Sequence, residues 1–226
     1  MNPMTKLLIA TAAFLATHYI SSTPLRAWLT RALGTNGYLL LYSAVAFATL
    51  GGMAWTYYHA PFLGWWHVPA LRYVPLFVMP LAMILIICGL MTRNPTLVGS
   101  ERLLRSTEPA QGILRITRHP LMWGIALWAA SHVIARGDMA AAVFFGSFLA
   151  LALTGTVLID RRKRMTLGAD WQRFAAVTSN VPFAAIITGA NRFRAGEIGW
   201  GRPLAGLALY GAVLWLHPLL FGARPY

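Results

Sequence analysis

The chain has 226 residues, of which 58% are hydrophobic and only 11% are charged. Typical soluble domains contain about 25% charged residues, so this composition excludes an ordinary soluble globular protein and predicts an integral membrane protein. The net charge of +13 does not indicate nucleic-acid binding, because the cations lie between apolar runs, as they do in the loops of membrane proteins. We therefore expect the lipid bilayer, and no nucleic acid, as a partner. The length favours one domain over residues 1–226.

The apolar runs predict an all-α polytopic bundle with about six spanning helices. A helix needs ~20 mostly apolar residues to cross the ~30 Å hydrocarbon core of a bilayer. No small-residue cleavage site follows the first run, so we interpret it as a span and not as a signal peptide. The predicted spans cover residues 4–22, 37–58, 73–92, 119–136, 139–159 and 203–221.

Most of the 19 Lys and Arg residues fall in loops on one side of these spans, opposite to both termini. Cytoplasmic loops carry an excess of Lys and Arg, which predicts a multi-pass protein of the bacterial inner membrane with its long basic loops in the cytoplasm. In the second long loop, 160–202, Trp171, Phe174 and Val177 recur at helical spacing. This pattern predicts an amphipathic helix that lies on the membrane surface.

The acidic residues are few and all fall in predicted loops or at span ends. This distribution argues against a proton relay or a metal site built from carboxylates inside the membrane. The six residues are Glu101, Glu108, Asp138, Asp160, Asp170 and Glu197.

Among ionisable side chains, only histidines are placed deep in the predicted spans. A lone buried histidine is most often bonded to a backbone carbonyl or a hydroxyl, but two or three together can hold a haem inside a helix bundle. His18 lies near the cytoplasmic end of the first span and His59 at the outer end of the second. His132 follows small residues that let a helix approach either a flat macrocycle or another helix. His67 and His217 are predicted at the membrane interface.

Arg118 and His119 stand directly before Pro120, a residue that suits the first position of a helix. Two interpretations of these residues remain open. They either bind a phosphate or carboxylate group, or they mark the cytoplasmic boundary of the fourth span.

The segments RITRHP (115–120) and PFAAI (182–186), together with further stretches along the chain, resemble the NnrU family, a set of bacterial membrane proteins associated with denitrification and nitric oxide metabolism. That family shares ancestry with the 15-cis-zeta-carotene isomerases of plants and cyanobacteria. The resemblance extends over nearly the whole chain and is most specific in the RITRHP and PFAAI segments. The stretches are THYISSTPLR (17–26), GILRITRHPLMWG (112–124), WAASH (128–132), DRR (160–162), TSNVPFAAI (178–186), EIGW (197–200) and HPL (217–219).

The resemblance implies a haem b protein with isomerase-like chemistry on a lipophilic polyene, in which reduced iron promotes rotation about a double bond without net redox change. It places the two axial ligands at His18 and His132. Three residues before the second ligand, where the isomerases have a cysteine, this chain has Ala129, so the resemblance does not extend to a cysteine ligand.

The predicted topology sets a second expectation for the ligands. His132 follows the start of its span by 13 residues, roughly 20 Å, whereas His18 lies near the cytoplasmic end of its own span. His59 matches the depth of His132 better and remains an alternative partner. The candidate cofactor-binding residues are therefore His18, His132, His59, Arg118 and His119, with His18 and His132 as the metal ligands.

Two other functions remain open at this point. The RHP-x-x-x-G helix start also resembles the isoprenylcysteine carboxyl methyltransferases, which bind S-adenosylmethionine at the cytoplasmic face. Those enzymes carry a glutamate pair after the next helix, where this chain has Asp160, Arg161 and Arg162. The third possibility is a membrane partner that supports the assembly or signalling of other proteins without catalysis.

Overall fold

The computed structural model describes residues 1–97, 100–106 and 108–225, and it confirms the all-α class. Shorter helical turns connect the long helices: η1 (Pro69–Tyr73), η2 (Glu101–Arg105), η3 (Gly112–Arg115), α6 (Ala184–Ile187) and η4 (Ala195–Glu197). The long helices are α1 (Pro3–Ile20), α2 (Pro24–Tyr58), α3 (Val74–Met91), α4 (Pro120–Arg136), α5 (Met139–Ala176) and α7 (Gly201–Phe221).

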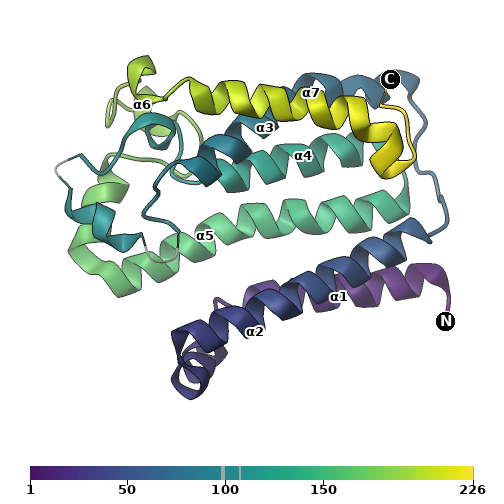
Figure 1. The fold of residues 1–226 in the computed structure, drawn as a ribbon, viewed down its shortest axis with the longest axis horizontal. Helices are drawn as coiled ribbons and strands as arrows, with labels where there is room; N and C mark the ends of the chain where they lie inside the picture. The colour runs from purple at the N-terminus through teal and green to yellow at the C-terminus, as the bar shows by residue number, and fades with distance from the viewer. Residues whose placement is uncertain (98–99, 107, 226) are drawn as a thin grey trace.

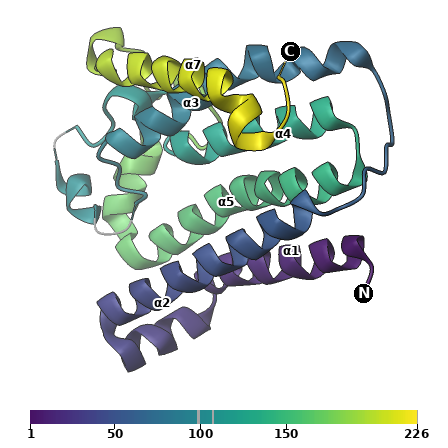
Figure 2. The same cartoon turned by 45° about the vertical axis from the view of Figure 1, so that its right-hand side comes forward.

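α1 and α2 form a pair and both contact α5, and α4, α3 and α7 follow in that order on the other side of α5 (Figures 1 and 2). α5 lies between the α1–α2 pair on one side and α4 on the other, and α3 and α7 cover the far side of α4. Both termini lie at the same end of the bundle, as an even number of crossings requires. The connecting turns η2, η3 and α6 gather at the opposite end.

Among the described residues, four helices are long and apolar enough to cross a membrane. They are α2, α5, α7 and the segment Pro69–Met91, which consists of η1 and α3. α1 and α4 have 18 and 17 residues, at the short limit of about 17–25 for a span. Each of the six predicted spans thus corresponds to a long helix. The chain is a membrane protein.

Two helices extend well beyond their predicted bounds. α2 begins at Pro24 rather than at residue 37, and it contains a break at Gly34, where φ is 70°. α5 does not end at residue 159 but continues to Ala176, with a second break at Gly168, where φ is 50°. Glycine adopts positive φ at little steric cost, so each break separates two helical segments that run in different directions.

The amphipathic segment after residue 160 is the last part of α5, and its apolar side faces protein rather than lipid. Trp171 and Phe174 have 1% and 0% of their surfaces exposed. They pack against Cys88 of α3 and against Leu104 and Leu114 of the preceding loop. The expectation of a surface-lying helix is corrected here, because η2 and η3 contribute the side chains that cover its apolar stripe in place of lipid.

The tight turn between α4 and α5 aligns the two central helices. Gly137 ends α4 in the left-handed conformation, and the Asp138 carboxylate accepts a hydrogen bond from the Ala141 N–H at 3.0 Å, which caps α5. A side chain at Gly137 would collide with Trp66. The turn therefore places α4 and α5 antiparallel, with His132 one turn before the end of α4.

Candidate functional site

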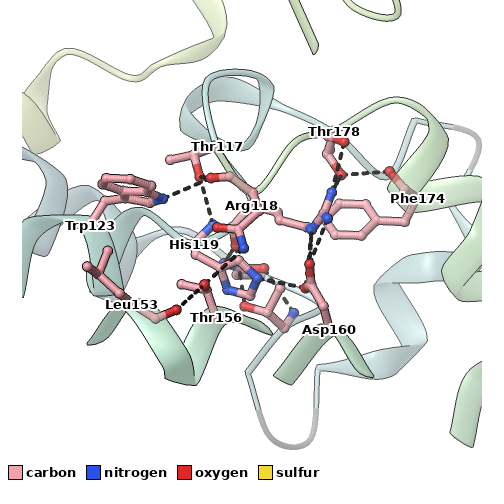
Figure 3. Close-up of polar contacts among 12 residues, drawn as sticks. Thr117, Arg118, His119, Trp123, Leu153, Thr156, Asp160, Phe174 and Thr178 are labelled. Atoms are coloured by element: carbon pink, nitrogen blue, oxygen red, sulfur yellow. Dashed lines mark hydrogen bonds and ion pairs between the residues drawn. The ribbon is translucent and has the colours of Figure 1, made fainter. Parts of the chain in front are cut away.

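A buried ionic cluster forms where the start of α4 meets α5 (Figure 3). The guanidinium of Arg118 donates two hydrogen bonds to one carboxylate oxygen of Asp160, from Nε at 2.9 Å and from Nη2 at 2.7 Å, both to Oδ2. His119 donates from Nε2 to the other carboxylate oxygen, Oδ1, over 2.7 Å. Only 1% of the His119 side chain is exposed, and 12% and 11% of Arg118 and Asp160. Arg118 and Asp160, 42 positions apart in the chain, thus belong to one site that is largely shielded from solvent.

Asp160 is the residue that the sequence analysis missed. Its carboxylate was expected at the end of a span, but α5 continues for a further 16 residues and holds it inside the protein. The sequence analysis placed Asp160 at the end of a span and did not connect it with Arg118 or His119. The signal in the sequence was the Arg118–His119 pair itself, because a buried guanidinium requires a counter-charge and this chain has only six acids from which to supply it.

A layer of neutral hydrogen bonds fixes the TSNVPF segment against the same two helices. The carbonyl of Asn180 accepts from Thr117 Oγ1 at 2.6 Å and from Trp123 Nε1 at 2.8 Å. The Asn180 side chain donates to Thr156 Oγ1 of α5 at 2.9 Å. Buried polar groups are stable only when they are paired, so these residues position the loop and the start of α4 together.

A second ionic cluster joins the loop before α4 to the turn before α7. Arg115 donates from Nε to Glu197 at 2.6 Å and from Nη1 to Asn191 at 2.7 Å. Glu197 also accepts from Arg194 at 3.0 Å and from the backbone N–H of Gly112 at 3.2 Å. Beside the cluster lies a cavity of about 310 Å³, lined in part by Glu108, Arg115, Asn191, Arg192 and Arg194.

The second cluster predicts a pH dependence of stability. The hydrogen bond from Arg115 lowers the pKa of Glu197 from its ordinary 4.5 to about 2. A carboxyl group whose pKa falls on folding stabilises the fold above its unfolded-state pKa, and this contribution is lost as the pH falls from 4.5 towards 2. We expect the unfolding temperature of the wild type to fall towards that of Glu197→Gln across this range. The half-exposed Glu108, replaced by Gln, is the control and should change little.

His18 and His132 lie at opposite ends of one aromatic cluster. His18 contacts Phe14 with ring centroids 4.2 Å apart, and Phe14 contacts Phe148 of α5 at 5.0 Å. Phe148 in turn contacts Trp128 at 5.1 Å, and Trp128 contacts His132 at 5.7 Å. The structure therefore places both histidines around α5 but separates them by three aromatic rings.

The other predicted site residues lie elsewhere. His59 is exposed at the end of α2, beside a cavity of about 290 Å³ that Pro3, Lys6 and Trp55 also line. Arg118 and His119 are bonded to Asp160, so their role towards a cofactor stays a prediction. In the described part of the chain, no three His, Cys, Asp or Glu side chains converge on a common point. A metal held by one or two imidazoles, as iron is in haem, needs no such convergence.

Comparisons with known proteins give two partial relatives and one family. A chloroplast 15-cis-zeta-carotene isomerase of Arabidopsis thaliana is 40% identical over 78 residues, which is 34% of this chain and 21% of the relative. A protein of the same name from Zea mays is 36% identical over 81 residues, which is 36% of this chain and 22% of the relative. The matched region thus spans about a fifth of each curated relative. No solved structure matches the chain.

The family match has a different extent. The family described as NnrU protein matches residues 6–225, which include the long helices apart from the first three residues of α1, both ionic clusters and the histidines His18 and His132. A match of this length relates the whole fold rather than one segment of it, and the chain belongs to the NnrU protein family.

Proposed function

We propose that this chain is a haem b protein that carries out isomerase-like chemistry on a lipophilic polyene within the membrane. The family supports a membrane protein of this type, and the names of the two partial relatives supply the reaction class. The resemblance discussed above supports a role in nitrogen-oxide metabolism. The distribution of basic residues supports the bacterial inner membrane, with the long loops in the cytoplasm.

The observation that carries the proposal is the bonding of the two intramembrane imidazoles. Nδ1 of His18 lies 2.8 Å from the carbonyl oxygen of Phe14, and Nδ1 of His132 lies 2.8 Å from that of Trp128. A carbonyl only accepts, so Nδ1 carries the proton and Nε2 keeps its lone pair. Among the described residues, neither Nε2 has a hydrogen-bond partner. This is the state in which histidine ligates iron.

The surroundings of His18 fit a flat, largely apolar group with polar edges. The imidazole is half-buried, so a ligand can reach it without displacing a core side chain. Two buried hydroxyls on the same two helices lack a hydrogen-bond partner: Thr11, two helical turns before His18 on the same face of α1, and Tyr38 of α2, which is connected to His18 through Tyr42. When bound, haem would supply an iron centre that weakens a conjugated double bond enough for rotation. His18 would hold it, and the aromatic side chains would exclude water.

The position of His132 favours one histidine per iron over a bis-histidine pair. His132 stacks on Phe145 of α5, with centroids 4.9 Å apart, whereas Tyr19, next to His18, is bonded to Thr154 of α5. Phe145 and Thr154 are nine residues apart in α5, about 13 Å along the helix. Two axial nitrogens on one iron are only ~4 Å apart. We therefore assign His18 as the ligand and His132 to the apolar wall of the pocket.

The test is the visible spectrum of the protein purified in mild detergent, oxidised and then reduced with dithionite. We expect a Soret band and reduced α and β bands. His18→Ala should abolish them, and His132→Ala should shift them without loss of haem. The exposed loop residue His67, replaced by alanine, serves as the control. Loss of haem in both His18→Ala and His132→Ala would instead establish the bis-histidine pair.

A separate measurement tests the reaction. Haem-loaded protein in liposomes is supplied with 15-cis-zeta-carotene under reducing conditions, and the isomers are separated by chromatography. Formation of the trans isomer supports catalysis. Haem binding without isomerisation would favour the assembly or signalling role. A featureless spectrum after expression with ample haem would overturn the haem proposal, and S-adenosylmethionine binding would be measured next.

A further inference from the structure

The break in α2 brings together two residues that a straight helix would keep apart. Arg26 and Tyr38 are 12 positions apart, which in a continuous helix means about 18 Å along the axis. Because Gly34 adopts a φ of 70°, residues 24–33 fold back at the loop end of the bundle (Figure 2). The guanidinium carbon of Arg26 then lies 5.8 Å from the centroid of the Tyr38 ring.

Tyr38 has a polar group that the protein itself does not satisfy. Only 4% of its surface is exposed, and its hydroxyl has no hydrogen-bond partner. A buried hydroxyl that is left unpaired destabilises the fold, because it has lost its hydrogen bonds to water. An unpaired buried hydroxyl in a native fold needs an explanation. A ligand that accepts a hydrogen bond from this hydroxyl would provide one.

Arg26 supplies a charge at the same place. It is half-buried and has no ion pair within the described part of the chain. The carboxylates with described ion pairs lie elsewhere, and their arginine partners are Arg115, Arg118, Arg136, Arg173 and Arg194. The site around Arg26 is therefore suited to an external anion.

A continuous strip of rings joins this polar end to His18. Tyr38 stacks on Tyr42 with centroids 5.9 Å apart, and Tyr42 meets the edge of the His18 ring at 6.1 Å. The end of α1 is held against α5 at the same level, because Arg162 donates to the carbonyl of Ser21 at 3.1 Å. The strip thus has an open imidazole nitrogen at one end and a cation with an unpaired hydroxyl at the other.

We propose that Arg26 and Tyr38 bind the carboxylate side chains of the haem whose iron is held by His18. This inference rests on the proposed function. A guanidinium binds a carboxylate through two parallel hydrogen bonds, and the phenol hydroxyl donates a third. The haem ring then lies along Tyr42, with its carboxylates at the loop end of the bundle.

The test compares haem with its dimethyl ester, in which both carboxylates are blocked. Each is titrated into apoprotein in detergent and followed by its Soret band. We expect the wild type to bind haem about tenfold tighter than the ester, because charge-assisted hydrogen bonds are lost on esterification. Arg26→Gln should remove most of this preference. Arg31→Gln, an exposed arginine on the same helix, should retain it.

Tyr38→Phe provides a second readout that separates ligand binding from folding. It removes only the hydroxyl, so the apoprotein should unfold at the same or a higher temperature, since an unpaired buried group is lost. Its affinity for haem should fall severalfold, while its affinity for the ester changes less. A merely structural tyrosine would show the opposite pattern, with a less stable apoprotein and an unchanged preference.

Each result decides between the two proposals. Equal binding of haem and ester by the wild type, or equal losses in Arg26→Gln and Arg31→Gln, overturns the carboxylate site and leaves the haem proposal intact. If the wild type binds neither compound, the proposed function fails and this inference fails with it.

Discussion

Replacing Asp160 with asparagine should lower the free energy of unfolding by about 3–5 kcal/mol, since removing one partner of a buried ion pair leaves an uncompensated charge. Asp160 is the acceptor for both Arg118 and His119, and all three side chains are nearly buried. The amide retains the shape of the carboxylate but has no charge, so the guanidinium loses its counter-ion while it stays out of water. The measurement is thermal unfolding of the purified protein in detergent.

The matched control for this prediction is Asp170→Asn on the same helix. Asp170 pairs with Arg173 at 2.6 Å, and 39% and 61% of the two side chains are exposed. Exposed pairs contribute about 0–1 kcal/mol, so the control should unfold close to the wild type. In the Asp160→Asn background, Arg118→Met should recover part of the loss, because the unpaired charge is removed. Equal effects of Asp160→Asn and Asp170→Asn would contradict the prediction.

Gly124→Ala should destabilise the protein by about 1–3 kcal/mol, the range for inserting atoms into a packed interior. Gly124 lies where α4 crosses α3. A Cβ atom there would come within 2.7 Å of Ile86 Cγ1 and within 2.8 Å of the carbonyl oxygen of Ala82. Because part of this obstacle is backbone, the two helices would have to separate. That movement would also displace His119 and His132, which α4 positions.

Gly146→Ala is the comparison that isolates packing from helix propensity. Gly146 lies in α5, and a Cβ atom there would meet no other atom within 4 Å. Alanine restricts the unfolded chain more than glycine, so this substitution should stabilise by about 0.5–1 kcal/mol. Opposite signs for the two glycines, measured by thermal unfolding, are the expected result. A loss of stability in both would mean that the α3–α4 contact is not the cause.

The long helices were predictable because their length is set by the bilayer and their apolar composition is visible without any knowledge of packing. The runs at 73–92 and 203–221 coincide closely with α3 and α7. The bounds of α2 and α5 were wrong for one physical reason. Hydropathy reports where an apolar run ends, whereas a helix continues as long as its backbone hydrogen bonds do. Charged residues such as Arg26 and Arg162 end an apolar run, but they do not end a helix.

The membrane class, the set of long helices, the shared end of the two termini and the resemblance to one family could all be predicted from the amino-acid sequence. These follow from composition, from the length of apolar runs and from short motifs, all of which are local in the chain. Three features became visible only in the folded chain: Asp160 pairs with Arg118 and His119, Arg26 lies over Tyr38, and aromatic rings separate His18 from His132. These contacts join residues far apart in the chain, and they depend on the glycine breaks and on how each helix packs against its neighbours, which no local pattern encodes.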